Sequence, residues 1–210
     1  WYRYAEVAAD VIERVVSGEI RRLIVMAPPR HGKSELFSRL LPAYFVYRNP
    51  DKFAAIASYG ARLAEGFNRH ARRHYFAMCG IDRTETTAVE HWETGKGGGA
   101  WAVGVGGGST GKGFHLGVTD DPVKDDQEAQ SEVIRQRTTD WYESVWSTRR
   151  APDAAEVIVM TRWHEQDLVG YLLEKEDSDS PECWHVVNMQ AVYDPANMIE
   201  LPKSCTLEPD

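Results

Sequence analysis

The sequence predicts an α/β fold with a mainly parallel central sheet flanked by helices. Short apolar runs of strand length alternate with longer segments of helical periodicity along the chain. Parallel strands need long crossover connections, which are usually helical, so this alternation favours βαβ units. The chain has 210 residues, 42% of them hydrophobic, which is enough for one sizeable core.

In the first half of the chain, helical and strand patterns follow one another in regular order. In chain order they predict a helix over Tyr4–Val16, a strand over Arg22–Met26, a helix over Lys33–Tyr47, a strand over Phe53–Ser58 and a helix over Ala61–Met78. Proline and glycine punctuate these segments at Pro28, Pro29 and Gly60.

The second half begins with a glycine-rich segment, Trp92–Gly113, which has too many glycines for a helix. A strand over Ala100–Val105 is expected to lead into its loop. The remaining expected elements are a strand over Phe114–Thr119, a helix over Gln127–Thr148, a strand over Glu156–Met160, a helix over Gln166–Lys175 and a strand over Trp184–Asn188. Beyond Tyr193 the pattern becomes a proline-rich loop.

The charge of the chain is acidic overall but uneven. The 24 Lys and Arg residues against 32 Asp and Glu give a net charge of −8, which by itself argues against a nucleic-acid-binding domain. Residues 1–76 carry a net charge of +6, however, and residues 77–210 carry −14. The overall charge argues against nucleic-acid binding and the basic first segment permits it, so the motifs are needed to choose between these interpretations.

Cysteine usage and hydropathy point to a reducing, cytoplasmic setting. The three cysteines are far apart and predict neither a disulfide framework nor a cysteine zinc site. No apolar run is long enough to cross a membrane. The chain starts with Trp1 instead of Met and ends in a loop-like stretch, so we expect an excised fragment.

The segment Ala27-Pro-Pro-Arg-His-Gly-Lys-Ser34 carries the strongest chemical signal. It matches the phosphate-binding loop G-x-x-x-x-G-K-[ST] except at its first position, where Ala27 replaces glycine. The expected strand before it and helix after it are the context that this motif requires. Backbone N–H groups at the start of a helix bind anionic phosphate, and the helix dipole favours the negative charge. We therefore predict an ATP site.

Individual residues of this loop have distinct expected roles. Gly32 allows close backbone approach, Lys33 reaches the β- and γ-phosphates, and Ser34 ligates Mg²⁺. Pro28 and Pro29 have no N–H group, so the backbone donors must come from the segment Arg30–Ser34.

A phosphate-binding loop also needs a carboxylate at the end of a neighbouring strand. Asp120, after the expected strand Phe114–Thr119, is the predicted second Mg²⁺ ligand, and Asp121 is placed to orient or deprotonate the attacking water. If Asp121 is too short, the fallbacks are Asp125, Asp126 and Glu128. The alternative is an acidic turn that ends at Pro122.

The chain resembles the large terminase subunit of tailed double-stranded DNA phages, the ATPase that packages the genome. Four stretches carry the resemblance, with Pro-Pro-Arg-His-Gly-Lys-Ser and Thr-Arg-Trp-His as the most specific pieces. They are Gly18–Glu35, Ala57–Ala64, Gly106–Gly113 together with Asp120–Pro122, and Met160–Leu168.

The resemblance implies a P-loop NTPase of the additional-strand, RecA-like class that uses ATP and Mg²⁺. It implies a ring of identical subunits on the portal of the procapsid, with double-stranded DNA and the small terminase subunit as partners, in the host cytoplasm and away from membranes. Residues 1–193 would form the ATPase domain, and residues 194–210 would start a linker to a nuclease domain. Because that nuclease would follow residue 210, we expect no DNA cleavage from this chain.

The resemblance also assigns site residues. The nucleotide would contact Arg30, His31, Gly32, Lys33, Ser34 and Glu35. Thr161 would sense the γ-phosphate and couple hydrolysis to movement, although its hydroxyl could equally cap the helix that follows. A cation acting on the neighbouring subunit's site would be Lys112, with Arg149, Arg150 and Arg162 as rivals, or Lys112 would be a solvated loop residue.

Weaker patterns remain open. A basic stripe on the helix Ala61–Met78 could meet DNA phosphates or an acidic neighbour, although a solvated face is commoner. This stripe consists of Arg62, Arg69 and Arg73, with Arg72 and His74 beside it. The segment Tyr2–Tyr4 could stack on adenine or fill the core. His70 and His74 are spaced as a metal pair, but no third ligand is evident.

Two other functions compete with the packaging motor. One is another P-loop translocase or helicase, which the lack of helicase motifs after residue 122 disfavours. The other is a nucleotide-binding switch module without turnover, which the departures at Ala27 and Asp121 would permit.

Overall fold

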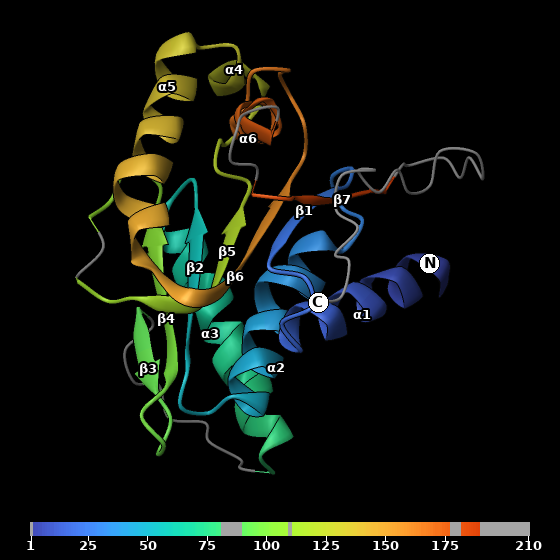
Figure 1. Ribbon diagram of the computed structural model, residues 1–210, viewed down its shortest axis with the longest axis vertical. Coiled ribbons are helices and arrows are strands. Elements are labelled where there is room, and N and C mark those ends of the chain that lie inside the picture. Colours follow the sequence, from blue (N-terminus) through green and yellow to red (C-terminus); the bar gives the residue numbers. More distant parts are fainter. Residues whose placement is uncertain (1, 81–89, 109–110, 177–181, 190–210) are drawn as a thin grey trace, which may run out of the picture.

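The architecture is a three-layer α/β arrangement, with helices on both faces of a central sheet (Figure 1). The computed structural model describes residues 2–80, 90–108, 111–176 and 182–189. The segment 194–210, expected to begin a linker, lies outside the described residues.

The sheet has seven strands in the order β3-β4-β2-β5-β6-β1-β7. All neighbouring strands are parallel except β3 and β4, which are antiparallel. Their bounds are β1 Arg22–Met26, β2 Phe53–Ser58, β3 His91–Glu93, β4 Gly99–Gly104, β5 Phe114–Asp120, β6 Arg150–Met160 and β7 His185–Asn188. The mainly parallel sheet is thereby confirmed.

The helical elements connect these strands. The α-helices are α1 Tyr2–Val16, α2 Leu41–Arg48, α3 Ala61–Met78, α4 Asp126–Ala129, α5 Glu132–Trp141 and α6 Leu168–Glu176. Two π-helical segments, η1 Glu35–Leu40 and η2 Tyr142–Trp146, and a 3₁₀ turn, η3 Ser147–Arg149, complete the set. None of the described helices is long and apolar enough to cross a membrane.

The core has two main parts because successive residues of a buried parallel strand point to opposite faces. Leu23 and Val25 of β1 pack with α1 and α2 on one face of the sheet. Ile24 packs on the other face with Trp141 and Trp146 from the α5–η2 segment. Both faces of the central strands are therefore buried, which fits their apolar sequences.

Several expected bounds are wrong. The helix expected over Lys33–Tyr47 has nearly the expected bounds, but it is π-helical at Glu35–Leu40 instead of α-helical throughout. The helix expected over Gln127–Thr148 is interrupted at Gln130–Ser131, after the short helix α4. Strand β6 starts at Arg150, six residues before its expected start at Glu156.

The glycine-rich segment contains a hairpin and a crossover. Strand β3, which was not expected, pairs with β4 through Trp92 and Ala100. Strands β4 and β5 lie on either side of β2 and are both parallel to it. The connection between them therefore crosses β2, and its described residues form no helix. The absence of bulky side chains at its glycines suits this path.

The strand order brings three segments to one edge. Strand β6 lies between β1 and β5, in register with both. Because all three are parallel, their carboxyl ends meet at the same edge of the sheet, where ligands bind in open α/β folds. The loop after β1, the Asp120–Asp121 pair after β5 and Thr161 after β6 are thus neighbours.

Candidate functional site

The loop from Ala27 to Ser34 turns sharply between β1 and η1. Arg30 and Gly32 have positive φ angles of 62° and 79°. Within the described part of the chain, the backbone N–H groups of Arg30 to Ser34 donate to no other backbone carbonyl. A set of free N–H groups at the start of a helix is suited to an anion, because the helix dipole adds positive potential there.

Lys33 points from this loop into the space between the strand ends. Lys33 is only 6% exposed to solvent. The Nζ atom donates to Asp121 Oδ1 at 2.7 Å and to Thr161 Oγ1 at 2.6 Å. Lys33 thereby contacts two other predicted site residues, which lie 88 and 128 positions after it in the sequence.

Asp121 is held by backbone and side-chain contacts. Its φ is +40°, a conformation that non-glycine residues rarely adopt. Its N–H donates to the carbonyl of Val159, and its own carbonyl accepts from the N–H of Tyr59. Besides Lys33, its Oδ1 accepts from the backbone N–H of Thr161 at 2.9 Å. The carboxylate is therefore fixed in direction.

Asp120 is almost completely buried, with 1% of its surface exposed. Burial, reinforced by the charge of Asp121, raises its pKa to about 6. Hydrogen bonds from the hydroxyls of Ser38 and Ser34, together with the charge of Lys33, oppose that rise. Ser34, the other predicted Mg²⁺ ligand, therefore lies close enough to Asp120 to affect its pKa.

Thr161 belongs to the site and does not cap a helix. Its hydroxyl accepts from Lys33 and donates to the carbonyl of Ala27 at 3.2 Å. Helix α6 begins only at Leu168, and it is Asp167 Oδ1 that accepts from the N–H of Gly170 in its first turn. The capping interpretation of Thr161 is therefore wrong.

The three fallback carboxylates serve the start of α4. Asp125 Oδ1 accepts from the N–H of Glu128, and Glu128 Oε2 accepts from the N–H of Lys124. Asp126 accepts from the side chain of Gln130. The contacts of Asp125 and Glu128 cap the start of α4, and that of Asp126 joins two side chains one turn apart. Among these acids, the described contacts therefore place only Asp121 against Lys33.

The other residues expected to bind the nucleotide differ in orientation. His31 Nδ1 lies 2.9 Å from the carbonyl of Pro29 within the loop. The Glu35 carboxylate forms ion pairs with Arg39 at 2.6 Å and His74 at 3.7 Å on the surface of η1. The Glu35 side chain is therefore occupied elsewhere, and its backbone N–H is what it can offer a phosphate.

The candidates for a cation acting in trans divide into two groups. Lys112 precedes β5 and lies near Glu93. The pKa of the Glu93 carboxyl is lowered mainly by His91 and more weakly by the charge of Lys112. Since Asp120 is at the other end of β5, Lys112 is roughly 20 Å from its own site, given about 3.3 Å per strand residue.

Of the rival arginines, Arg150 and Arg162 are engaged in ion pairs. Arg150 contacts Glu156 at 3.4 Å and Glu182 at 2.8 Å. Arg162 contacts Asp167 at 2.6 Å. The Nε of Arg149 is buried and has no hydrogen-bond partner within the described residues.

The basic stripe on α3 is only partly exposed. Arg62 and Arg73 are exposed and Arg69 is half-buried, but Arg72 is buried and does not belong to an outer face. Burial, together with the charges of Arg39 and Arg73, lowers the pKa of His70. A solvated face remains the simplest interpretation of this stripe.

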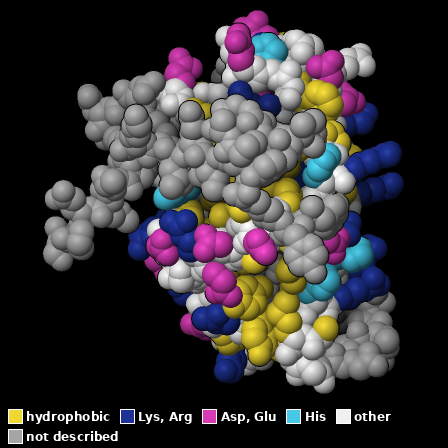
Figure 2. Space-filling view, turned by 90° about the vertical axis from the view of Figure 1, so that its right-hand side faces the viewer, with side chains coloured by type: hydrophobic (Ala, Val, Ile, Leu, Met, Phe, Trp, Pro, Cys, Tyr) yellow, Lys and Arg dark blue, Asp and Glu magenta, His cyan; other side chains and the backbone are white. Residues whose placement is uncertain are grey.

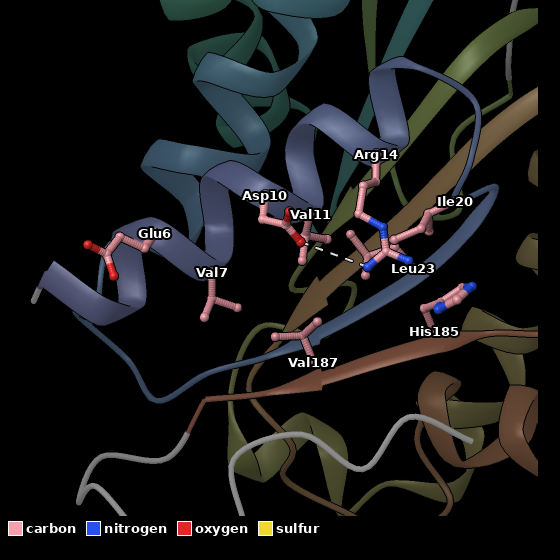
Figure 3. Close-up of a pocket in the computed structure, with 9 residues that line it drawn as sticks. All are labelled: Glu6, Val7, Asp10, Val11, Arg14, Ile20, Leu23, His185 and Val187. Atoms are coloured by element: carbon pink, nitrogen blue, oxygen red, sulfur yellow. Dashed lines mark ion pairs between the residues drawn. The ribbon is translucent and has the colours of Figure 1, made fainter. Parts of the chain in front are cut away.

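A separate pocket of about 280 Å³ lies between α1 and the β1–β7 edge of the sheet (Figure 3). Val7, Val11, Leu23 and Val187 give it apolar walls, and charged side chains of α1 stand at its margin. None of the predicted site residues lines it.

The segment Tyr2–Tyr4, expected to stack on adenine or to fill the core, is described only in part. The side chains of Tyr2 and Arg3 lie outside the described residues, and burial raises the pKa of Tyr4 to about 12.

Ser38 is a site residue that sequence reasoning missed. It is fully buried in η1, and its hydroxyl donates to Asp120 Oδ2. The motif ends at Ser34, and a serine within a helical pattern carries no signal of its own. Only the fold shows that it faces a carboxylate 82 residues away.

Fold and site together define an α/β protein in which the loop after β1 faces two carboxylates at the carboxyl edge of a mainly parallel sheet. A family model described as the N-terminal part of the terminase large subunit, T4-like virus type, matches residues 24–207. The chain belongs to this family, whose role is the packaging of phage DNA. No curated protein matches it.

Proposed function

We propose that this chain hydrolyses ATP to move double-stranded viral DNA into a procapsid. The observation that carries the proposal is the bridge from Lys33 to Asp121 and Thr161, next to the buried carboxylate of Asp120. It unites the loop, the acidic pair and the coupling residue at one point of the sheet, and membership of the terminase family supports it.

The residues present fit a nucleotide phosphate with Mg²⁺. The free N–H groups of Arg30 to Ser34 suit the phosphate oxygens. Ser34 and Asp120 offer oxygen ligands, and Mg²⁺ typically takes one or two protein ligands of this kind with phosphate and water filling the rest. The position of β6 between β1 and β5 matches the additional-strand class of P-loop proteins.

The Lys33–Asp121 contact suggests how the site changes on binding ATP. The Lys33 ammonium forms an ion pair with the Asp121 carboxylate. A phosphate in the loop offers Lys33 a more highly charged partner, which frees Asp121 to orient the attacking water. Ser34 and Asp120 would hold Mg²⁺, which would supply positive charge to neutralise the phosphates.

The contacts of Thr161 support a role in coupling hydrolysis to movement. Its hydroxyl contacts Lys33 and the carbonyl of Ala27, and its N–H contacts Asp121. Any displacement of Lys33 toward a phosphate removes one of these contacts. The contacts of the segment after β6 would therefore change when a nucleotide binds or is hydrolysed.

The wider assignments extend this proposal. The motor would be a ring of identical subunits on the procapsid portal, working with the small terminase subunit in the host cytoplasm, with Lys112 completing a neighbour's site. DNA cleavage would belong to a nuclease domain after residue 210. A helicase-type translocase and a switch module without turnover remain the competing functions.

ATP turnover by the purified chain tests the proposal. Lys33→Ala removes the cation expected at the β- and γ-phosphates, and Asp121→Ala removes the residue expected to orient water. We expect Lys33→Ala to weaken ATP binding and abolish turnover. Asp121→Ala should keep ATP binding but lower turnover by roughly 100-fold or more.

The alternatives give different results. Equal ATP binding by all three proteins without hydrolysis would leave only the switch module. ATP-dependent unwinding of a duplex, without translocation along intact duplex DNA, would favour a helicase. Glu132→Gln, an exposed change on α5, is the control and should retain full turnover.

A further inference from the structure

Ser38 makes a contact that differs from those of several other helical Ser and Thr hydroxyls in the described part of the chain. Ser and Thr side chains within helices usually donate to the carbonyl four residues earlier. That is what Thr138, Thr139, Ser144 and Ser147 do here, with carbonyls of their own helical segment. Ser38 instead donates across to Asp120 Oδ2 on strand β5.

The π-helical form of η1 accompanies this contact. The N–H of Leu41 donates to the carbonyl of Leu36, five residues earlier, which widens the turn that contains Ser38. Such π-helical turns are rare and often occur at functional sites. Here the turn lies directly after the phosphate-binding loop and keeps Ser38 buried against β5.

Both partners of the contact are removed from solvent. Ser38 is 0% exposed and Asp120 is 1% exposed. A buried carboxylate with one oxygen tied to a fixed donor cannot rotate freely, so its direction is set before any ligand arrives. Hydrogen-bonded partners of metal ligands commonly act in this way.

We propose that Ser38 is a positioning residue that orients Asp120 for Mg²⁺ in the nucleotide-loaded site. This inference rests on the proposed function, because it requires Asp120 to be a metal ligand. Ser38 itself acts through Asp120 and is not expected to touch the nucleotide. Its loss should therefore affect the metal more than the nucleotide.

Metal binding in the absence of turnover tests the role. Wild-type protein and Ser38→Ala are saturated with a non-hydrolysable ATP analogue, and Mn²⁺ binding is followed by the electron paramagnetic resonance of free Mn²⁺. We expect Ser38→Ala to weaken Mn²⁺ binding by roughly 10–100-fold. Affinity for the analogue in the presence of a chelator should stay within about twofold of wild type, since the loop donors are intact.

Ser58→Ala is the matched control. Ser58 is also fully buried and lies opposite Asp120 in the sheet register, yet its hydroxyl has no hydrogen-bond partner among the described residues. Its replacement should leave Mn²⁺ affinity unchanged. Ser38→Cys keeps a weak donor of similar size and should give an intermediate affinity, which guards against a folding defect in Ser38→Ala.

The outcomes separate this inference from the function beneath it. If wild type binds Mn²⁺ with the analogue and Ser38→Ala binds it equally well, Ser38 has no positioning role. Equal losses in Ser38→Cys, Ser38→Ala and Ser58→Ala would mean that packing alone matters. If wild type binds no analogue at all, the proposed function fails and the inference fails with it.

Discussion

Asp121 combines an uncommon backbone conformation with a fixed carboxylate. A positive φ in a non-glycine residue costs on the order of 1–3 kcal/mol and persists only where surrounding contacts hold it. Val159, Tyr59 and Thr161 supply those contacts through backbone groups. The direction of the carboxylate toward Lys33 is thus a product of the whole strand edge.

Glu156 is a second buried acid, remote from the candidate nucleotide site along β6. It is completely buried, and it accepts from the hydroxyl of Tyr142 at 3.1 Å and from Arg150 at 3.4 Å. Burial raises its pKa to about 7, and the attraction of Arg150 and Arg22 offsets only part of that effect. The folded chain therefore binds a proton here more tightly than the unfolded chain.

This raised pKa predicts a pH dependence of stability. Between the ordinary pKa of 4.5 and about 7, the folded state holds a proton that the unfolded state has lost, so the free energy of unfolding falls as pH rises. The contribution is at most about 3 kcal/mol. Urea unfolding at pH 5 and pH 7.5 should show a smaller difference for Glu156→Gln than for wild type.

The control for this measurement is an exposed acid. Glu132→Gln on the surface of α5 should keep the full wild-type difference between the two pH values. Asp120 adds a slope of the same sign in the metal-free protein and is common to all variants. Equal differences for wild type and Glu156→Gln would contradict the assignment.

Among the helices, two glycines have opposite packing requirements. Gly66 lies within α3, and a Cβ there would meet nothing within 4 Å. Gly170 lies in the first turn of α6, where a Cβ would collide with the carbonyl oxygen of Glu165. The first glycine is therefore dispensable and the second is required by a close backbone approach.

The two alanine variants should differ in sign. Gly66→Ala should raise the free energy of unfolding by about 0.5–1 kcal/mol, because alanine restricts the unfolded chain and favours a helix. Gly170→Ala should lower it by roughly 2 kcal/mol or more, because backbone must move. Thermal unfolding of both proteins checks this, and a stable Gly170→Ala would show that the Glu165 loop yields easily.

The expected elements are confirmed best where apolar runs have sharp edges. The strands Arg22–Met26 and Phe53–Ser58 and the helix Ala61–Met78 have the expected bounds, since prolines, glycines or charged turns flank them. Strand β3 has only three residues, too few for a periodicity to be recognised. The first half of β6 was missed because it contains Pro152 and Asp153 on an exposed stretch.

The candidate site was foreseeable only in part. Lys33, Ser34 and Asp120 follow from a motif and from a strand end, which are local signals. The contacts of Lys33 with Asp121 and of Ser38 with Asp120 depend on strand order, which no local pattern reveals. The π-helical turns were also missed, because a helical hydrophobic pattern does not distinguish them from an α-helix.

On the face of the molecule that Figure 2 shows, charge does not gather on a single basic surface. The face drawn in Figure 2 has acidic and basic side chains interspersed, with Lys and Arg side chains along one edge of the described part. The net charge of the whole chain is −8. This value fits the proposed motor, which would hold DNA through few cations at a time. Acidic and basic surfaces could then meet between neighbouring subunits.

A ring in which Lys112 completes a neighbour's site predicts complementation between variants. Lys112→Ala lacks the cation but has an intact nucleotide site, whereas Asp121→Ala has the reverse defect. Each alone should lose turnover by on the order of 100-fold. Mixing them at concentrations that assemble rings should restore activity, because mixed neighbours combine one intact cation with one intact site.

Two results would contradict this arrangement. Specific activity of wild type that is independent of protein concentration would exclude a site completed in trans. Full activity of Lys112→Ala would transfer the role to another cation, and Arg149 is then the next to test because its Nε has no partner among the described residues. Lys124→Ala, an exposed change after β5, serves as the control.

The place of β1 in the sheet has a consequence for synthesis on the ribosome. Strand β1 is translated before both of its neighbours, β6 and β7, which are encoded more than 120 residues later. Non-local pairing of this kind is slow, since a long loop must close first. The loop from Ala27 to Ser34 therefore acquires its final shape only after β6 and β7 have been translated, and the contact between Lys33 and Thr161 cannot form before then.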